Sequence, residues 1–397
     1  MPIPVTCWLY CRLSVRENTT LVKDLSSDPK FPIWISQSKD KADLLVSSWF
    51  PNRAPQTSHL PHAQTPSPTR PYHSVTFEEV EETLNDRSNT TAPSISGLNY
   101  LVWKWVLRCA PDELTAVVRA AVALGIHHSS WKQSLVAVIP KNNKKDMSLP
   151  KSHRPIQLIE CLGKLVEKIV ACRITFDLGK HKLMPFNQFG RRSNSSCPDL
   201  GLSLTHDIQT ARERGLVSSF LAVDIKGFFN HVDHVRLIDV LKHKGFPPNI
   251  VCWVQSFLQE RFVRVQVDDH VRNLHPQLVG VPQGSPVSLV LACIYSSAVL
   301  EHLNKDPIFA ETGNHPLPVG PRAYVDDFGF LAISDDLKLT YTRCEKPWTT
   351  LPTSSPPSAC PLTWTSVISC IFPGDADQPP TLPTATRHSE PSFTVTP

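Results

Sequence analysis

The segment Ala323-Tyr-Val-Asp-Asp-Phe328 sets two adjacent carboxylates, Asp326 and Asp327, between two short apolar runs that end at Ile333. This pattern predicts a β-hairpin with both carboxylates at its tip. Another apolar run, residues 217–223, predicts a buried strand and ends at Asp224. We therefore expect three carboxylates at strand ends, on a rigid support that faces a cleft.

Carboxylates held in this way suit metal-assisted phosphoryl chemistry. Two Mg²⁺ ions about 3.5–4 Å apart require hard oxygen ligands. One ion would lower the pKa of an attacking hydroxyl, and both would stabilise charge on a transferring phosphoryl group. The plainer interpretation is that Asp326 and Asp327 form a turn and that Asp224 caps one. For any one of these carboxylates taken alone, the plainer interpretation is the stronger.

The sequence around these segments alternates predicted helices and strands. Thr76 and Glu79 have capping-box spacing and predict a helix start. Ser285 is expected to cap the helix that begins at Pro286. Residues 163–174 predict an amphipathic helix, with a polar face of Lys164, Glu167, Lys168 and Arg173. Other helices are expected at 100–109, 111–124, 199–214, 234–244 and from 248 to 258, with a strand at 135–139.

Proline separates this region from both ends of the chain. The chain of 397 residues has 37 prolines and only 15 glycines, against average usage of about 5% and 7%. Six prolines lie in 51–71 and 11 in 346–397. We predict an N-terminal connector (1–74, with the linker at 51–71), a helical segment (75–134), a catalytic body (135–336), and a disordered Pro/Ser/Thr-rich tail (337–397).

Composition excludes several classes of protein. No apolar run reaches the roughly 18 residues of a membrane helix, so no membrane partner is expected. The N-terminus lacks the pattern of a secretory signal. The 11 cysteines form no CxxC pair and indicate reduced thiols in an intracellular protein. A net charge of +4 neither requires nor excludes a nucleic-acid partner.

Six sequence blocks, in order, favour the metal-site interpretation of the carboxylates over the turn interpretation. They are AVIPKNNKKDMSLPKSHRPIQL, GKLVEKIVACRI, NQFGRRSNSS, LAVDIKGFFNHVDHVRL, GVPQGSPVS and AYVDDF. Together they resemble the reverse transcriptase of non-LTR (LINE-like) retrotransposons of the fungal type. The similarity runs from about residue 75 to about residue 336. It implies an α+β fold with the fingers and palm of a right-hand polymerase.

The resemblance also implies roles for the carboxylates and for one aromatic ring. Asp224 and Asp326 match the two metal-binding aspartates of the palm, and Asp327 matches the supporting one. The cofactor would be Mg²⁺, two ions, with Mn²⁺ as an alternative. Phe229 matches the steric gate that excludes a ribose 2′-hydroxyl. The alternative for Phe229 is a core aromatic residue beside Phe228.

Further matches imply contacts with the substrates, which would be an RNA template, a DNA primer and dNTPs. Lys141 and Arg154 match positions of the fingers that contact the incoming triphosphate, a role suited to an ammonium and a guanidinium fork. Their alternative is a solvated basic loop. Gln283 and Gly284 match the loop that touches the template and the nascent base pair, where the alternative is an ordinary turn before a helix.

The resemblance ends near Asp336, where a helical thumb would follow. The proline-rich tail cannot supply a helical bundle, so we expect the thumb to be missing and the chain to be a truncated retrotransposon product with reduced or no activity. The implied reaction is RNA-directed DNA synthesis. The alternatives are a non-catalytic RNA-binding retroelement remnant, an unstable relic, or a group II intron maturase. Nuclear action is suggested by the resemblance alone.

Overall fold

The computed structural model of the chain describes most residues between 33 and 340. The described residues are 22–24, 33–51, 66–142, 145–192, 195–225, 227–268, 270–305, 320–336, 339–340, 343, 364–372 and 386–387. Most of the predicted linker lies outside them. Its last residues run beside α9 (His234–His243) and the turn that follows, since Ser67 donates to the His243 carbonyl and Arg70 to the Gly245 carbonyl.

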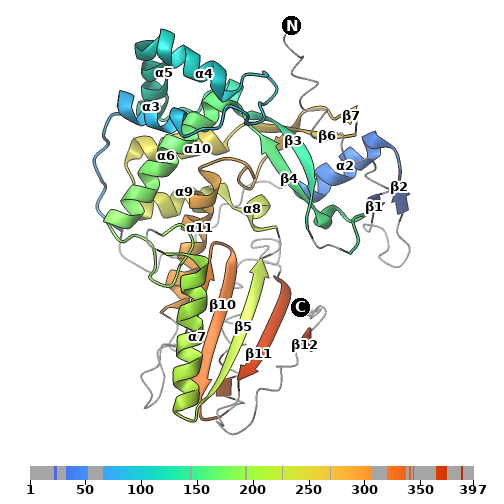
Figure 1. The fold of residues 1–397 in the computed structure, drawn as a ribbon, viewed down its shortest axis with the longest axis vertical. Coiled ribbons are helices and arrows are strands. Elements are labelled where there is room, and N and C mark those ends of the chain that lie inside the picture. Colours follow the sequence, from blue (N-terminus) through green and yellow to red (C-terminus); the bar gives the residue numbers. More distant parts are fainter. Residues whose placement is uncertain are drawn as a thin grey trace.

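A five-stranded sheet in the lower half of Figure 1 contains the strands predicted to carry the carboxylates. Its order is β12 (Thr386–Arg387), β11 (Trp364–Phe372), β5 (Val217–Ile225), β10 (Asp327–Ser334) and β9 (Gly320–Tyr324). All neighbouring strands are antiparallel. Helix α7 (Cys197–Glu213) packs along the sheet through Ala211. The predicted strand ending near Asp224 and the predicted hairpin are both confirmed.

A second sheet lies in the upper half of the molecule (Figure 1). Its strands are β3 (Gln133–Pro140), β4 (His153–Leu158), β6 (Arg261–Val267), β7 (His270–Val271) and β8 (His275–Gln277). The order is β4-β3-β6-β7, with β8 also paired to β6. Strand β3 runs antiparallel to β4 and parallel to β6. The β3–β4 pair brings the predicted basic positions at both ends of a polar loop side by side.

Helix α2 (Ser38–Trp49) lies where the sequence analysis expected only a connector. It packs on the second sheet, where its apolar side chains form a core with valines of β3 and β6. These residues are Ala42, Leu45, Val46, Trp49, Val136, Val263, Val265 and Val267. Their spacing on α2 follows one helical face. The prediction of a connector without structure is corrected for this segment. The apolar stripe of α2 is short and lies among polar residues, so the sequence pattern did not indicate a helix. Strands β1 (Val22–Asp24) and β2 (Ile33–Ile35) precede α2 and pair with each other.

Helices surround the main core between the two sheets. They are α3 (Phe77–Asn85), α4 (Tyr100–Cys109), α5 (Pro111–Ala123), α6 (Cys161–Lys180), α8 (Phe228–His231), α9, α10 (Pro248–Leu258) and α11 (Ser288–Leu303). Two 3-10 turns, Ser129–Trp131 and Pro150–Ser152, precede β3 and β4. The predicted helices are confirmed, with ends that agree within two or three residues except in α6, which continues to Lys180 beyond the predicted end at residue 174. None of the described helices is long and apolar enough to cross a membrane.

Helix α6 differs from the prediction of a solvent-facing polar side. Lys164 is 9% exposed and Glu167 is fully buried. The helix runs through the main core, where Leu165, Ile169 and Ile174 pack. An ionisable residue of α6 therefore lies inside the protein, which local periodicity alone could not indicate.

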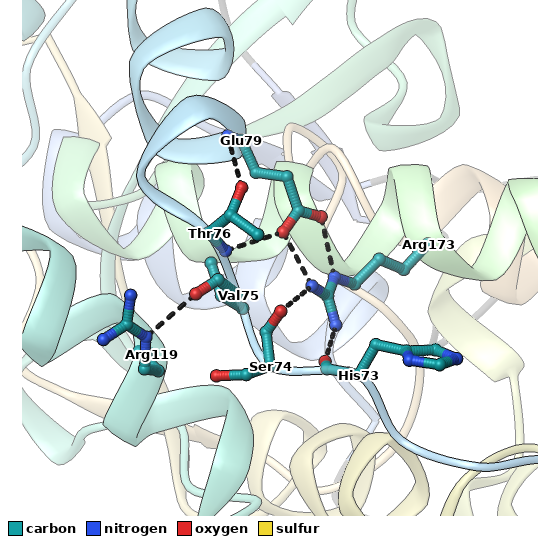
Figure 2. A network of polar contacts seen from close by, with 7 residues as sticks. All are labelled: His73, Ser74, Val75, Thr76, Glu79, Arg119 and Arg173. Carbon is teal, nitrogen blue, oxygen red and sulfur yellow. Dashed lines mark hydrogen bonds and ion pairs between the residues drawn. The ribbon is translucent and has the colours of Figure 1, made fainter.

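The N-terminal edge of this core is fixed by an arginine of α6 (Figure 2). Arg173 donates to both carboxylate oxygens of Glu79, at 2.9 and 2.7 Å, and to the carbonyls of His73 and Ser74. Glu79 also closes the predicted capping box with Thr76. Because the same carboxylate serves both partners, the start of α3 and the extended chain before it are held on α6.

The predicted tail contributes two of the strands of the lower sheet. β11 pairs with β5 over Ile225 to Ser218, and β12 pairs with β11. For these two segments the prediction of disorder is corrected. Residues 364–372 contain no proline and are rich in β-branched and aromatic residues, which favours a strand. The rest of the tail lies almost entirely outside the described residues, and no helical bundle of the thumb type is present among those described after Ser334.

Candidate active site

The three predicted aspartates lie at one end of the lower sheet. In the β5–β10 pairing, Asp327 is the register partner of Asp224. Asp327 also pairs with Tyr324 across a two-residue turn formed by Val325 and Asp326. Asp326 is half-buried and Asp327 is exposed. The hairpin thus turns one residue earlier than a tip centred on both aspartates.

The turn between β9 and β10 has a strained backbone at Val325. Its φ is +62°, a left-handed conformation that is unfavourable for a β-branched residue. The side chain of Gln188, which is fully buried, supports it from below. Its Oε1 accepts hydrogen bonds from the N–H groups of Val325 (3.1 Å) and Gly190 (2.9 Å), and its Nε2 donates to Ser296 Oγ (3.1 Å). These contacts hold the turn that carries Asp326.

Two charged residues, one of them Asp326 of this turn, affect the pKa of the buried cysteine Cys293. Burial raises the pKa of the Cys293 thiol to about 12. The positive charge of Arg191 and the negative charge of Asp326 both reach this thiol and act on its pKa in opposite directions.

Phe229 lies on the wall of a cavity of about 240 Å³. The cavity is lined by Phe229, Pro282, Gln283, Gly284, Ser285, Ser288 and Leu289. The neighbouring Phe228 is buried and packs edge-on against the Phe229 ring, with 5.9 Å between centroids. Phe228 is thus the core aromatic residue of the pair, whereas Phe229 is half-buried beside open space. The structure brings three of the predicted substrate contacts, Phe229, Gln283 and Gly284, into one place.

The loop of Gln283 and Gly284 is attached on both sides. Toward α8, Val281 N–H donates to the Phe229 carbonyl (2.7 Å), and Gln283 Nε2 donates to Asn230 Oδ1 (3.0 Å). Toward β4, Gln157 N–H donates to the Gln283 carbonyl (2.7 Å). At Gly284, φ is +128° and an added Cβ would lie 2.5 Å from the Gln157 carbonyl oxygen. Glycine is required there for both reasons.

Lys141 and Arg154 lie together on the β3–β4 pair. Arg154 is paired with Ile139, and Lys141 follows the end of β3, with its N–H donating to the Ser152 carbonyl (2.8 Å). Arg154 is exposed, and Lys141 is half-buried. Neither residue is among those that line the cavity beside Phe229. They are linked to it through β4, because Gln157 of the same strand holds the Gln283 loop.

The donor set suits a divalent cation. Carboxylate oxygens are the ligands that Mg²⁺ prefers, and the strand register sets Asp224 opposite Asp327 with Asp326 next in sequence. The side chain of Asp224 lies outside the described part of the structure. Within that part, no group of three or more His, Cys, Asp or Glu side chains forms a metal cluster. The fit to a metal therefore rests on register and donor chemistry.

Two residues that support the site carried little signal in sequence. Gln188 belongs to the quoted block NQFGRRSNSS, but its contact with Val325 joins residues 137 positions apart. Glu167 was placed on a polar helix face, although its carboxylate lies in the core and accepts a hydrogen bond from Ser285. Its spacing with Lys164, Lys168 and Arg173 is that of a polar helix face, so the sequence carried no sign of the second role.

Comparisons with known proteins match a large part of the chain. The family model described as "Reverse transcriptase (RNA-dependent DNA polymerase)" matches residues 139–343. The chain is 28% identical over 236 residues to an RNA-directed DNA polymerase from the mobile element jockey of Drosophila melanogaster, covering 58% of this chain and 25% of the relative. It is 27% identical over 268 residues to a probable RNA-directed DNA polymerase from transposon X-element of the same species, covering 67% and 27%.

A third relative comes from another insect. The chain is 23% identical over 301 residues to a retrovirus-related Pol polyprotein from the type-1 retrotransposable element R2 of Nasonia vitripennis, covering 73% of this chain and 27% of the relative. The chain thus spans about a quarter of the length of these relatives. The residues matched by the family model, 139–343, contain both the β9–β10 hairpin and the Gln283 loop.

Proposed function

Since the chain belongs to the reverse transcriptase (RNA-dependent DNA polymerase) family, we propose that it adds dNTPs to a DNA primer on an RNA template. The observation that carries the proposal is the register pairing of Asp224 with Asp327, beside Asp326, at the end of the lower sheet. In the reaction, the primer 3′-hydroxyl loses its proton to water and its oxygen bonds to the α-phosphorus of the dNTP. The bond from that phosphorus to the oxygen that bridges it to the β-phosphorus breaks, and pyrophosphate leaves.

Asp224 and Asp326 would hold two Mg²⁺ ions, with Asp327 in support. When bound, the ions would lower the pKa of the primer hydroxyl and stabilise charge on the phosphates. The contribution of the protein is position: Gln188 and Ser296 fix the turn that carries Asp326. A carboxylate on a fixed turn reaches its working geometry without reorganisation during the reaction.

The other predicted residues would select and orient the substrates. Arg154 and Lys141 would bind the triphosphate from the β3–β4 pair, Arg154 through its guanidinium fork. The Phe229 ring, half-buried at the cavity wall, would meet a ribose 2′-hydroxyl and so favour deoxynucleotides. The backbone at Gly284, which has no side chain, would allow the nascent base pair to approach closely.

Primer extension tests the proposal. The full chain is assayed with an RNA template, a DNA primer, dNTPs and Mg²⁺, beside Asp326→Asn. The matched control is Asp112→Asn, which changes an exposed aspartate in the first turn of α5. We expect extension by wild type and control, and a loss of about a hundredfold or more in Asp326→Asn, the scale for one preorganised electrostatic group. Equal signal from wild type and Asp326→Asn would refute the proposal.

The alternative, an RNA-binding protein without catalysis, gives a different outcome. It predicts no extension by any variant, with salt-dependent RNA binding that persists in Asp326→Asn. The named relatives support the non-LTR class of element. They do not support the narrower fungal type, so the proposal is limited to the broader class.

A further inference from the structure

A buried ionisable cluster lies behind the Gln283 loop. Glu167 of α6 is 0% exposed, and its Oε2 accepts a hydrogen bond from the Ser285 hydroxyl at 2.6 Å. Ser285 directly follows Gly284 and is itself buried. The contact joins positions 118 residues apart, so it ties the loop to the long central helix and not to its own neighbours.

Ser285 uses its hydroxyl twice. It donates to Glu167, and its oxygen accepts a hydrogen bond from the Val287 N–H at 3.2 Å. The sequence predicted that Ser285 caps the following helix, but α11 begins at Ser288 with Val287 at its N-cap position. The hydroxyl instead closes a short turn before the helix. Removing it would release both the carboxylate and the turn.

The surroundings of Glu167 make a charged carboxylate energetically unfavourable there. Burial raises its pKa, and the charge of Arg261 opposes that rise. Arg261 is also buried, and burial lowers its pKa to about 10. His127 lies beside the carboxylate, with 3.6 Å between Nε2 and Oε1, and its own burial keeps its pKa well below the usual range. Buried charged groups of this kind add little to stability compared with apolar residues of similar volume.

The opposite side of the loop is held independently. Gln157 donates its N–H to the Gln283 carbonyl, and its side chain is fixed by Ser134 (2.9 Å) and Gln277 (3.1 Å). The peptide between Gln283 and Gly284 is thus clamped between β4 and α6. Glu167 supplies the α6 side of this clamp through Ser285.

We propose that Glu167 is a positioning residue for polymerisation, which holds Ser285 so that Gln283 and Gly284 keep the shape that receives the incoming nucleotide. The inference rests on the proposed function. It predicts that the Ser285 hydroxyl governs the KM for dNTP and leaves the Kd for template–primer unchanged. A residue that served stability alone would not separate these two constants.

Single-nucleotide extension by the full chain measures both constants in Ser285→Ala, Glu167→Leu and the double variant. We expect Ser285→Ala to raise the KM for dNTP about tenfold, the scale of one buried hydrogen bond to a carboxyl group. Glu167→Gln, whose amide oxygen still accepts from Ser285, should stay within about threefold of wild type. The double variant should match Glu167→Leu, because the two residues share one contact.

The matched control is Ser297→Ala. Ser297 is a buried serine of α11 whose hydroxyl donates to the Ile294 carbonyl within the same helix. We expect wild-type constants from it. A wild-type KM in Ser285→Ala, or additive effects in the double variant, would overturn the inference. If Glu167→Leu does not fold, Ser285→Ala and Glu167→Gln still decide it.

Hydrogen exchange separates this inference from the proposed function. The amides of Val281, Gln283 and Val287 should exchange faster in Glu167→Leu, which keeps the Ser285 hydroxyl, than in wild type or Ser297→Ala, without added substrates. If wild type extends no primer, the proposed function fails, and the exchange data alone decide whether Glu167 fixes the loop. Unchanged exchange at the Val287 amide would show that it does not.

Discussion

Replacing Gly190 by alanine tests whether the β9–β10 turn must be held from below. A Cβ added at Gly190 would lie 2.6 Å from the Val325 backbone nitrogen and 2.7 Å from Val325 Cγ2. Both distances are shorter than real Cβ atoms tolerate. The backbone atom can move only if the turn moves, because Val325 is bound to Gln188. We therefore expect the methyl group to push the turn that carries Asp326.

The size of the effect follows from two contributions. Overpacking a buried site costs about 1–3 kcal/mol. Gln188 Oε1 accepts from both Gly190 and Val325, and loss of one of these hydrogen bonds costs about 1 kcal/mol more. The free energy of unfolding should thus fall by about 2–4 kcal/mol. A displacement of roughly 1 Å at the turn should also lower the rate of extension about a hundredfold.

Urea unfolding and primer extension measure the two effects on the same preparation. The control is Gly201→Ala on α7, where an added Cβ meets nothing within 4 Å. Alanine there should stabilise the helix by about 0.5–1 kcal/mol and leave extension unchanged. If Gly190→Ala extends primers at the wild-type rate while folded, the turn does not depend on the support that the structure describes.

Three further predictions address other parts of the molecule. Leu45→Ala should lower the free energy of unfolding by about 2–5 kcal/mol. The control is Leu202→Ala, at a side chain that is 70% exposed, and it should change this free energy by less than about 0.5 kcal/mol. Equal urea midpoints for the two variants would show that α2 does not pack on the second sheet. Phe229→Ala should raise the ratio of ribonucleotide to deoxynucleotide incorporation in single-nucleotide assays, and an unchanged ratio would end its assignment as a gate. Burial lowers the pKa of His127, so between that lowered pKa and about 6.5 the imidazole is neutral in the folded protein and protonated in the unfolded chain. As the pH falls below 6.5, the free energy of unfolding should therefore decrease by up to about 1.4 kcal/mol per pH unit. Urea melts of wild type and His127→Phe at pH 7.5 and 5.5 should show a smaller loss in the variant, and equal losses would contradict this.

Elements that depend on local pattern were predictable from the sequence. The capping box at Thr76 and the hairpin around Asp326 use residues close in sequence, so their spacing alone specifies them. Predicted helices such as those at α4 and α10 are confirmed for the same reason. The turn position shifted by one residue, because the strained backbone of Val325 depends on Gln188, far away in the chain.

Three features that the sequence analysis missed depend on partners far away in the chain. Helix α2 is defined by valines of β3 and β6, which lie about a hundred or more residues further on. Strand β11 is defined by its pairing with β5, in a tail whose average composition predicted disorder. A composition taken over a long segment conceals a proline-free stretch of strand length. Burial of Glu167 likewise follows from what packs around α6, not from the spacing of its own charged residues.

The costly features near the candidate site share a common logic. Val325 adopts a left-handed backbone that a β-branched residue disfavours, and Glu167 and Arg261 carry ionisable groups into the core. Well-packed apolar residues in place of the buried ionisable pair would often give an equally stable or more stable fold. Each feature instead fixes a short segment whose own sequence does not determine its shape: the turn with Asp326, or the loop with Gln283. A site that acts through preorganised charged groups needs such segments to be rigid before the substrate binds. The proposed chemistry would therefore require these supporting residues even though they lower the stability of the fold.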